Sequence, residues 1–163
     1  MKKLFSLFCI VFFSIQIFGQ RQINVSVGLD NIGLLNLGAQ YQIQQSQIGF
    51  SCGLVPRRNE TFISIAGDYY YHFGKLPKLS NLRPWYGKLG LDYILDSWSN
   101  GIDTYIFLNA RLGRDFNISH KLGIGMDAGV VVPLLNSKGI GPALGIRVFY
   151  KIYAKGPLKS NEV

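Results

Sequence analysis

At 163 residues the chain has room for one domain, and with 48% apolar but only 16% charged residues it lacks the charge-rich surface of an ordinary soluble protein. No long hydrophobic run follows the N-terminal segment, so the apolar residues are dispersed along the chain, as they are in membrane β-barrels. The formal net charge of +8 is spread over loops and the C-terminal segment instead of gathering on one face with interleaved aromatics, which argues against nucleic-acid binding.

Residues 1–20 predict an export signal peptide. Two lysines begin the segment, residues 4–18 form its apolar stretch, and Gly19 supplies a small residue for cleavage. Cys9 would leave with this segment, so that Cys52 would stand alone in the mature chain. We therefore expect no internal disulfide bond.

Alternation of apolar and polar residues marks the rest of the chain as a series of β-strands. In residues 34–44, apolar side chains from Leu35 to Ile43 alternate with polar or small ones from Asn36 to Gln44. A helix would scatter the same residues around its circumference. Eight such segments follow one another, at 22–29, 34–44, 47–55, 61–73, 85–95, 103–114, 121–132 and 143–153. The main connections are expected at 30–33, 56–60, 74–83, 96–101, 115–120 and 133–141.

These segments predict an all-β fold, an eight-stranded antiparallel up-and-down transmembrane β-barrel. The barrel domain is expected to span residues 21–153, and residues 154–163 to form a flexible C-terminal tail. The strands are about as long as the ~9–11 residues that a tilted strand needs to cross a bilayer. Open sheet edges are not tolerated in lipid, so the sheet must close on itself.

The polar face of the strands has the composition of a barrel interior. It carries nine glycines: Gly28, Gly38, Gly49, Gly53, Gly90, Gly123, Gly125, Gly129 and Gly145. Glycine is unfavourable on a water-exposed strand, whereas the interior of an eight-stranded barrel is only just wide enough for side chains. We therefore expect the polar face to point inward and the apolar face to meet lipid. A soluble barrel or sandwich, which also alternates, is the alternative.

The same inward parity carries charges of both signs. They are Asp68, Lys88, Asp92, Arg111, Asp127, Arg147 and Lys151. Buried charges persist only when they are paired and hydrogen-bonded, so a structural ion-pair network is expected in the lumen. The two arginines should pair with the three aspartates of this set and close the lumen to ions.

In residues 22–153, the strand count, the alternation and the placement of aromatic residues resemble the small eight-stranded outer-membrane barrels of Gram-negative bacteria, of the OmpA transmembrane-domain or OmpX type. The resemblance implies a monomer in the cell outer membrane, in contact with outer-membrane lipids and inserted by the barrel-assembly machinery. Such barrels end in a strand with a glycine and spaced aromatic or apolar residues, and Gly145, Val148 and Tyr150 are similar to that signal. The family's signal commonly ends the chain, whereas here ten residues follow Tyr153.

Aromatic residues of the apolar face gather toward one end of the predicted barrel. They are Tyr41, Tyr71, Phe73, Trp85 and Tyr153. Such rings keep an apolar body in lipid and a polar tip in water, so this set predicts the aromatic girdle of a membrane interface.

No catalytic, cofactor or metal site is indicated. Ser64, Asp68 and His72 share one face of a strand, but four residues along a strand separate side chains by roughly 13 Å, far beyond hydrogen-bond reach. No Cys/His cluster has metal-ligand spacing, and no phosphate-binding loop is present. The leading interpretation is an outer-membrane barrel with a packed, closed lumen and a structural or membrane-integrity role. The alternative is a barrel that binds a ligand at its rim or modifies lipid A.

Overall fold

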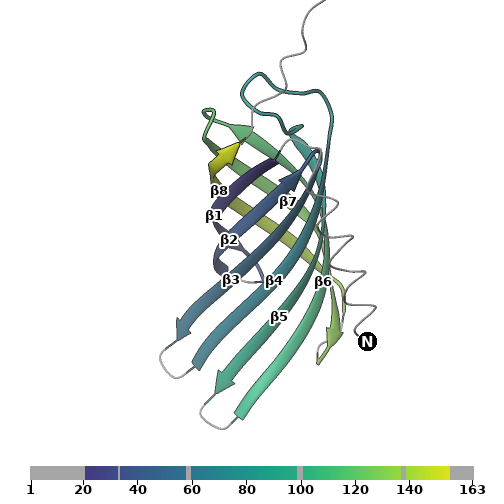
Figure 1. Cartoon of the computed structure of the whole chain (residues 1–163). Coiled ribbons are helices and arrows are strands. Elements are labelled where there is room, and N and C mark those ends of the chain that lie inside the picture. Colours follow the sequence, from purple (N-terminus) through teal and green to yellow (C-terminus); the bar gives the residue numbers. More distant parts are fainter. Residues whose placement is uncertain (1–20, 33, 58–59, 99–100, 137–138, 155–163) are drawn as a thin grey trace, which may run out of the picture.

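Eight antiparallel strands form one sheet that closes on itself, and each strand is hydrogen-bonded to its neighbours in the sequence (Figure 1). The computed structural model describes residues 21–32, 34–57, 60–98, 101–136 and 139–154. The strands are β1 (Arg21–Asp30), β2 (Leu34–Ile43), β3 (Ser46–Arg57), β4 (Glu60–Phe73), β5 (Trp85–Trp98), β6 (Gly101–Asn117), β7 (Leu122–Leu135) and β8 (Gly141–Ala154). The predicted up-and-down barrel of eight strands is confirmed. Among the described residues, no helix is long and apolar enough to cross a membrane.

The two ends predicted from the sequence fall mostly outside this description. The predicted signal peptide, residues 1–20, lies outside the described residues, and so does the predicted tail from residue 155 onward. Ala154, which was expected to begin the tail, instead ends β8 and pairs with Gln22 of β1.

The sheet closes with a stagger that tilts the strands around the barrel axis. A path that starts at Asn24 on β1 and steps from each residue to its register partner on the next strand reaches Gly141 on β8 after seven strand pairs. Across the closing pair, however, β1 places Asn24 opposite Lys151, so the stagger is ten residues (151 − 141). A barrel of eight strands has an interior that side chains can just fill, and the fold therefore needs a packed lumen.

Several strands extend further than their apolar alternation predicts. Pro56, Arg57 and Glu60 were expected to break the chain, yet they belong to β3 and β4. Residues 96–98 continue β5, and residues 115–117 continue β6, where a loop and a turn were predicted. The ladder is made of backbone hydrogen bonds, so it continues beyond the apolar band as long as a partner strand is present.

The barrel wall has an uneven height. β1 and β2 have 10 residues each, whereas β6 has 17. Figure 1 shows the β3–β4 and β5–β6 hairpins reaching well beyond the β1–β2 hairpin. The connection of residues 74–84 lies at the opposite end, where β1 begins and β8 ends (Figure 1).

The two faces of the sheet differ as parity predicts. Inward side chains such as Tyr70, Tyr86 and Phe149 are at most 3% exposed. Outward apolar side chains are open, with Leu37 64% and Leu89 57% exposed. The protein thus has a polar, filled interior and an apolar outer surface, the reverse of the usual arrangement in a soluble protein.

Candidate functional site

The seven charged residues predicted for the lumen all lie on the inner face of the barrel, and we call them the lumen cluster. Asp68 is on β4, Lys88 and Asp92 are on β5, Arg111 is on β6, Asp127 is on β7, and Arg147 and Lys151 are on β8. Six of them are buried and Asp127 is half-buried. The strand period of two brings them inside because they share a parity with the glycines.

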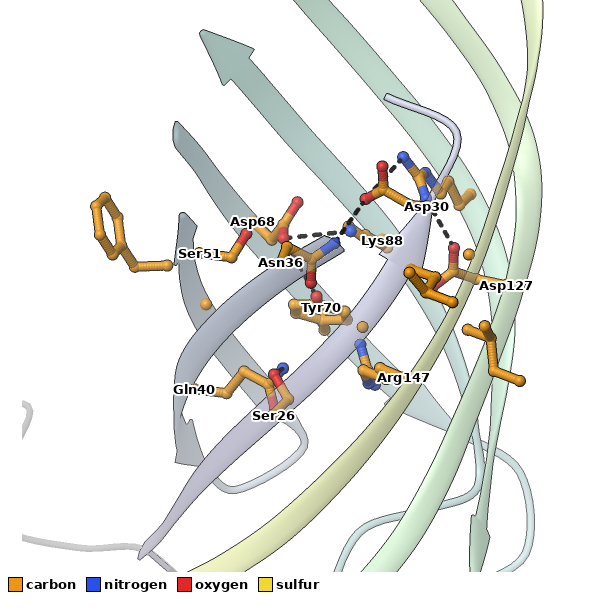
Figure 2. A pocket seen from close by; sticks show the side chains of 17 residues that line it. Ser26, Asp30, Asn36, Gln40, Ser51, Asp68, Tyr70, Lys88, Asp127 and Arg147 are labelled. Carbon is orange, nitrogen blue, oxygen red and sulfur yellow. Dashed lines mark hydrogen bonds and ion pairs between the residues drawn. The ribbon is translucent and has the colours of Figure 1, made fainter. Parts of the chain in front are cut away.

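Two ion pairs occupy the middle of the lumen. Lys88 Nζ lies 3.2 Å from Asp68 Oδ2, and Arg111 Nη1 lies 3.1 Å from Asp127 Oδ1. Arg111 Nη2 also lies 3.9 Å from Asp30 Oδ2 at the end of β1, a residue assigned to a turn in the sequence analysis. Figure 2 shows these acidic side chains and Lys88 converging from different strands on the interior.

Glycines opposite the acidic residues make room for these pairs. The register places Gly90 directly opposite Asp68, and Gly145 directly opposite Asp127. A Cβ atom at Gly145 would lie 2.6 Å from Asp127 Oδ1 and 2.9 Å from Arg111 Nη1. The absence of a side chain there lets Asp127 and Arg111 meet diagonally across the sheet.

Arg147 does not make the pair expected from the sequence. Its Nη2 donates to Asp115 Oδ1 at 3.0 Å, whereas Asp68, Asp92 or Asp127 had been predicted as its partner. The guanidinium also stacks on the rings of Tyr70 and Tyr86, with its carbon 4.8 Å and 4.7 Å from their centroids. Asp115 was missed because it was assigned to a turn. Continuing the parity of β6 past Arg111 would have placed it inside.

Asp92 and Lys151 have neutral hydrogen-bond partners. Asn109 Nδ2 donates to Asp92 Oδ2 at 2.6 Å. Lys151 Nζ donates to Asn117 Oδ1 at 2.7 Å and to Ser80 Oγ at 3.2 Å. The structure therefore brings five of the seven members into ion pairs and leaves these two in hydrogen bonds.

The connection of residues 74–84 closes one end of the lumen. Its Leu82 is buried, and its Ser80 accepts the hydrogen bond from Lys151. The backbone carbonyl of Pro84 accepts a hydrogen bond from the Asp115 amide at 2.7 Å. The sequence identified this segment as the longest connection but not as a cap on the barrel.

The residues that suggested a catalytic triad do not form one. His72 is fully buried. Its Nε2 lies 3.0 Å from Gln47 Oε1, and its Nδ1 lies 2.9 Å from the Arg83 carbonyl oxygen. Both ring nitrogens are thus engaged with groups other than Ser64 and Asp68. Within the described part of the chain, no group of His, Cys, Asp and Glu side chains could hold a metal ion.

A small cavity lies inside the barrel beside the ion pairs. A cavity of about 40 Å³ lies among Ser26, Asn36, Gln40 and Lys88 (Figure 2). That volume holds about three water molecules at ~10–15 Å³ each. Asp68 Oδ1, on a residue lining this cavity, has no hydrogen-bond partner within the protein, so water is the partner it can reach. The arrangement suits a hydrated ion-pair network.

The five predicted girdle residues lie close to one end of the barrel. Phe73 and Trp85 are direct register partners, and Tyr41 and Tyr153 are both paired with Ile23. The side chains of Tyr71, Phe73 and Trp85 are exposed on the outer surface, and that of Tyr41 is half-buried. The backbone of Tyr153 belongs to β8, but its side chain lies outside the described part.

Among the side chains that the structure describes, one charged residue on the outer face was missed. Arg114 follows Leu112 at the outward parity of β6 and is exposed between Trp85 and Phe116. It is the last residue of the predicted segment 103–114, and the same alternation continues to the end of β6 at Asn117.

No protein-family model matches the sequence, and a search of curated proteins finds no match. Among solved structures, the N-terminal β-barrel domain of Pseudomonas aeruginosa OprF is similar, with a TM-score of 0.58 and 13% identity over 82% of this chain and 99% of that domain. Neisserial surface protein A (NspA) gives a TM-score of 0.48 with 12% identity over 80% of this chain and 94% of that one. The de novo designed TMB2.3 gives a TM-score of 0.44 with 12% identity over 85% of this chain and 99% of that chain. The likeness to the OprF domain supports the barrel fold.

Proposed function

We propose that this chain is a small outer-membrane β-barrel with a closed lumen and a structural role in the membrane. The observation that carries the proposal is the inverted distribution of polarity: a ring of exposed apolar side chains around a charged, buried interior. Soluble monomers rarely expose contiguous apolar patches larger than a few hundred Å². A bilayer offers such a surface its natural solvent, since it buries the apolar face and leaves every strand paired.

The filled interior supports a structural role over transport. The ion pairs of the lumen cluster and the rings of Tyr70 and Tyr86 fill the interior between the described strands, where a cavity of about 40 Å³ lies beside them. The 74–84 connection packs its buried Leu82 at one end. No observation favours the enzymatic alternative, because the candidate His72 is engaged with Gln47 and a backbone carbonyl. We therefore propose no second function.

The same proposal includes how the chain reaches the membrane. Residues 1–20 would direct export, and the barrel-assembly machinery would insert the mature chain as a monomer. Gly145, Val148 and Tyr150, which lie on the final strand β8, are proposed to form the recognition signal. Outer-membrane lipids would cover the apolar face.

Fractionation of Gram-negative cells that express the chain tests the proposal. The mature protein should sediment with the outer membrane, and an unheated sample should migrate faster on a gel than a heated one. A matched variant lacking residues 2–20 should remain in the cytoplasm. Recovery of the exported, folded protein in the soluble periplasmic extract would refute the membrane location.

A further inference from the structure

Arg114 is a charged residue on the outer surface, where the other strand side chains that the structure describes are uncharged. Among the strand side chains that the structure describes, every other outward-facing residue is apolar or neutral, whereas the remaining strand cations face inward. Arg114 is exposed and has no carboxylate at ion-pair distance in the described part of the chain. A charged group on an apolar surface is unfavourable unless it meets a counter-charge or water, so its position needs an explanation.

Two aromatic rings hold the Arg114 guanidinium in place. Its carbon lies 5.1 Å from the ring of Trp85 and 5.0 Å from the ring of Phe116. The two rings thus flank the cation, and no hydrogen bond from its N–H groups is found among the described residues. These N–H groups can donate two parallel hydrogen bonds to a phosphate group.

The position of Arg114 along the strand matches a membrane interface. It is the register partner of Trp85, which in turn is the partner of Phe73, so the guanidinium lies at the level of the aromatic girdle. It is three residues from the end of β6 and at the end of the barrel where the chain enters β1 and leaves β8. An arginine near the interface of a β-barrel costs only ~0–1 kcal/mol, compared with ~2–4 kcal/mol at the midplane.

A hollow on the outer surface begins at Arg114. It measures about 900 Å³ and runs from Trp85 on β5 across the sheet to Leu29 on β1. Leu112, Met126, Ala128 and Leu144 are among the residues that line it. Arg114 is the single cation on its lining. The lining also includes Asp30, Asn31 and Asp127, but both carboxylates approach Arg111 inside the barrel. The Arg114 end of the hollow is therefore cationic and its middle is apolar, which is the polarity of an amphiphile with one anionic group.

We propose that this hollow binds an anionic phospholipid, with the phosphate on the Arg114 guanidinium and an acyl chain along Leu112, Met126 and Leu144. The lipid would belong to the leaflet on the side of the chain termini. This inference rests on the proposed membrane location and adds to it a site with a preferred headgroup. Charge complementarity selects the anionic headgroup, and the apolar lining selects the chain.

Quenching of Trp85 fluorescence by brominated lipids tests the site. The chain has two tryptophans, so a W98F variant reports from Trp85 alone. It would be refolded into phosphatidylcholine vesicles that contain a small fraction of brominated phosphatidylglycerol or, in a parallel sample, brominated phosphatidylcholine. We expect brominated phosphatidylglycerol to be enriched about fivefold at Trp85, the effect of one basic side chain near an anionic surface. The added variant R114Q should abolish the enrichment, whereas K121Q, which removes an exposed cation of the neighbouring turn, should retain it.

The outcomes separate this inference from the membrane location. Equal quenching by both lipids in the W98F protein, or a preference retained in R114Q, would refute the lipid site while leaving the barrel in the membrane. Equal losses in R114Q and K121Q would assign the preference to overall charge and likewise refute the site. If R114Q fails to refold, loss of the W98F preference in 1 M salt, where the Debye length is about 3 Å, supports the site provided that K121Q retains the preference at low salt. Persistence in 1 M salt, or loss in K121Q at low salt, refutes it. Absence of quenching by either lipid would refute the membrane location itself, unless cross-linking shows a dimer, which would assign the hollow to a second copy.

Discussion

Replacement of Gly113 by alanine should destabilise the barrel strongly, because the space for a side chain is already filled. Gly113 is directly opposite Tyr86, and a Cβ atom there would fall 2.5 Å from the Tyr86 hydroxyl oxygen. The ring cannot move aside easily. Tyr86 is 0% exposed, its hydroxyl donates to Asp127 Oδ2 at 3.0 Å, and Arg147 stacks on it.

The expected magnitude follows from these contacts. One extra methyl group in a packed core costs ~1–3 kcal/mol, and displacement of the hydroxyl from Asp127 would add ~1.5–3 kcal/mol for a hydrogen bond to a charged group. We expect Gly113→Ala to lower the free energy of unfolding by about 3 kcal/mol, near the lower part of the combined range, because the ring can tilt partly.

The adjacent register pair, Gly87 and Leu112, provides a control glycine that faces outward. Gly87 follows Tyr86, faces outward opposite Leu112, and has no atom within 4 Å of a Cβ placed on it. Gly87→Ala should therefore leave stability unchanged or raise it by up to ~1 kcal/mol through the reduced entropy of the unfolded chain. Urea titration of the protein refolded in vesicles, followed by gel mobility of unheated samples, measures both. Equal midpoints for the two variants would refute the tightly packed lumen.

Three further predictions address the orientation of the side chains, the ion pair of Arg147 and the closure of the lumen. Val27→Lys should reduce assembly, because a lysine near the midplane of the lipid face costs ~2–4 kcal/mol. The inward Asn36→Lys should disturb packing without that penalty. The yield of the fast-migrating, folded form on gels of unheated samples measures the assembly of both variants. Asp115→Asn should lower the free energy of unfolding by about 3–5 kcal/mol because it leaves Arg147 buried without its carboxylate, while the exposed Asp103→Asn should have little effect in the same urea titration. In planar bilayers the folded monomer should give no steady large conductance, and a stable open level would contradict the closed lumen.

The sequence predicts the fold well because a period of two over eight segments leaves few alternatives. It predicts the strand ends poorly, because polar residues and proline were read as chain breaks. Asp96 and Asp103 are register partners beyond the apolar band, and Pro56 pairs with Thr61. The backbone pairing of the neighbouring strands continues through these positions, and side-chain hydropathy carries no signal for it.

Parity likewise predicts which charges face inward but not which of them meet. Partners depend on the register between strands, and for Lys151 also on the connection that carries Ser80. Asp30 and Asp115, which approach the two arginines of the lumen cluster, were not considered as partners because they had been assigned to turns. The facing of a residue is a local property of its strand, whereas its pairing is a property of the assembled sheet.

Complementarity between glycines and long side chains supplies the register that alternation leaves open. A one-residue shift in the pairing of two strands would turn the apolar side chains inward, whereas a two-residue shift would keep every side chain on the same face of the sheet. In the observed pairing of β7 with β8, Gly125 is opposite Arg147 and Asp127 is opposite Gly145, so each long side chain faces a glycine. A two-residue slip that set Arg147 opposite Asp127 would bring two long side chains to one position and two glycine-sized gaps to another. In a lumen whose described part is closely packed, with a cavity of about 40 Å³ beside the ion pairs, both changes are unfavourable. The glycines on the inner face therefore specify the register as well as relieve crowding.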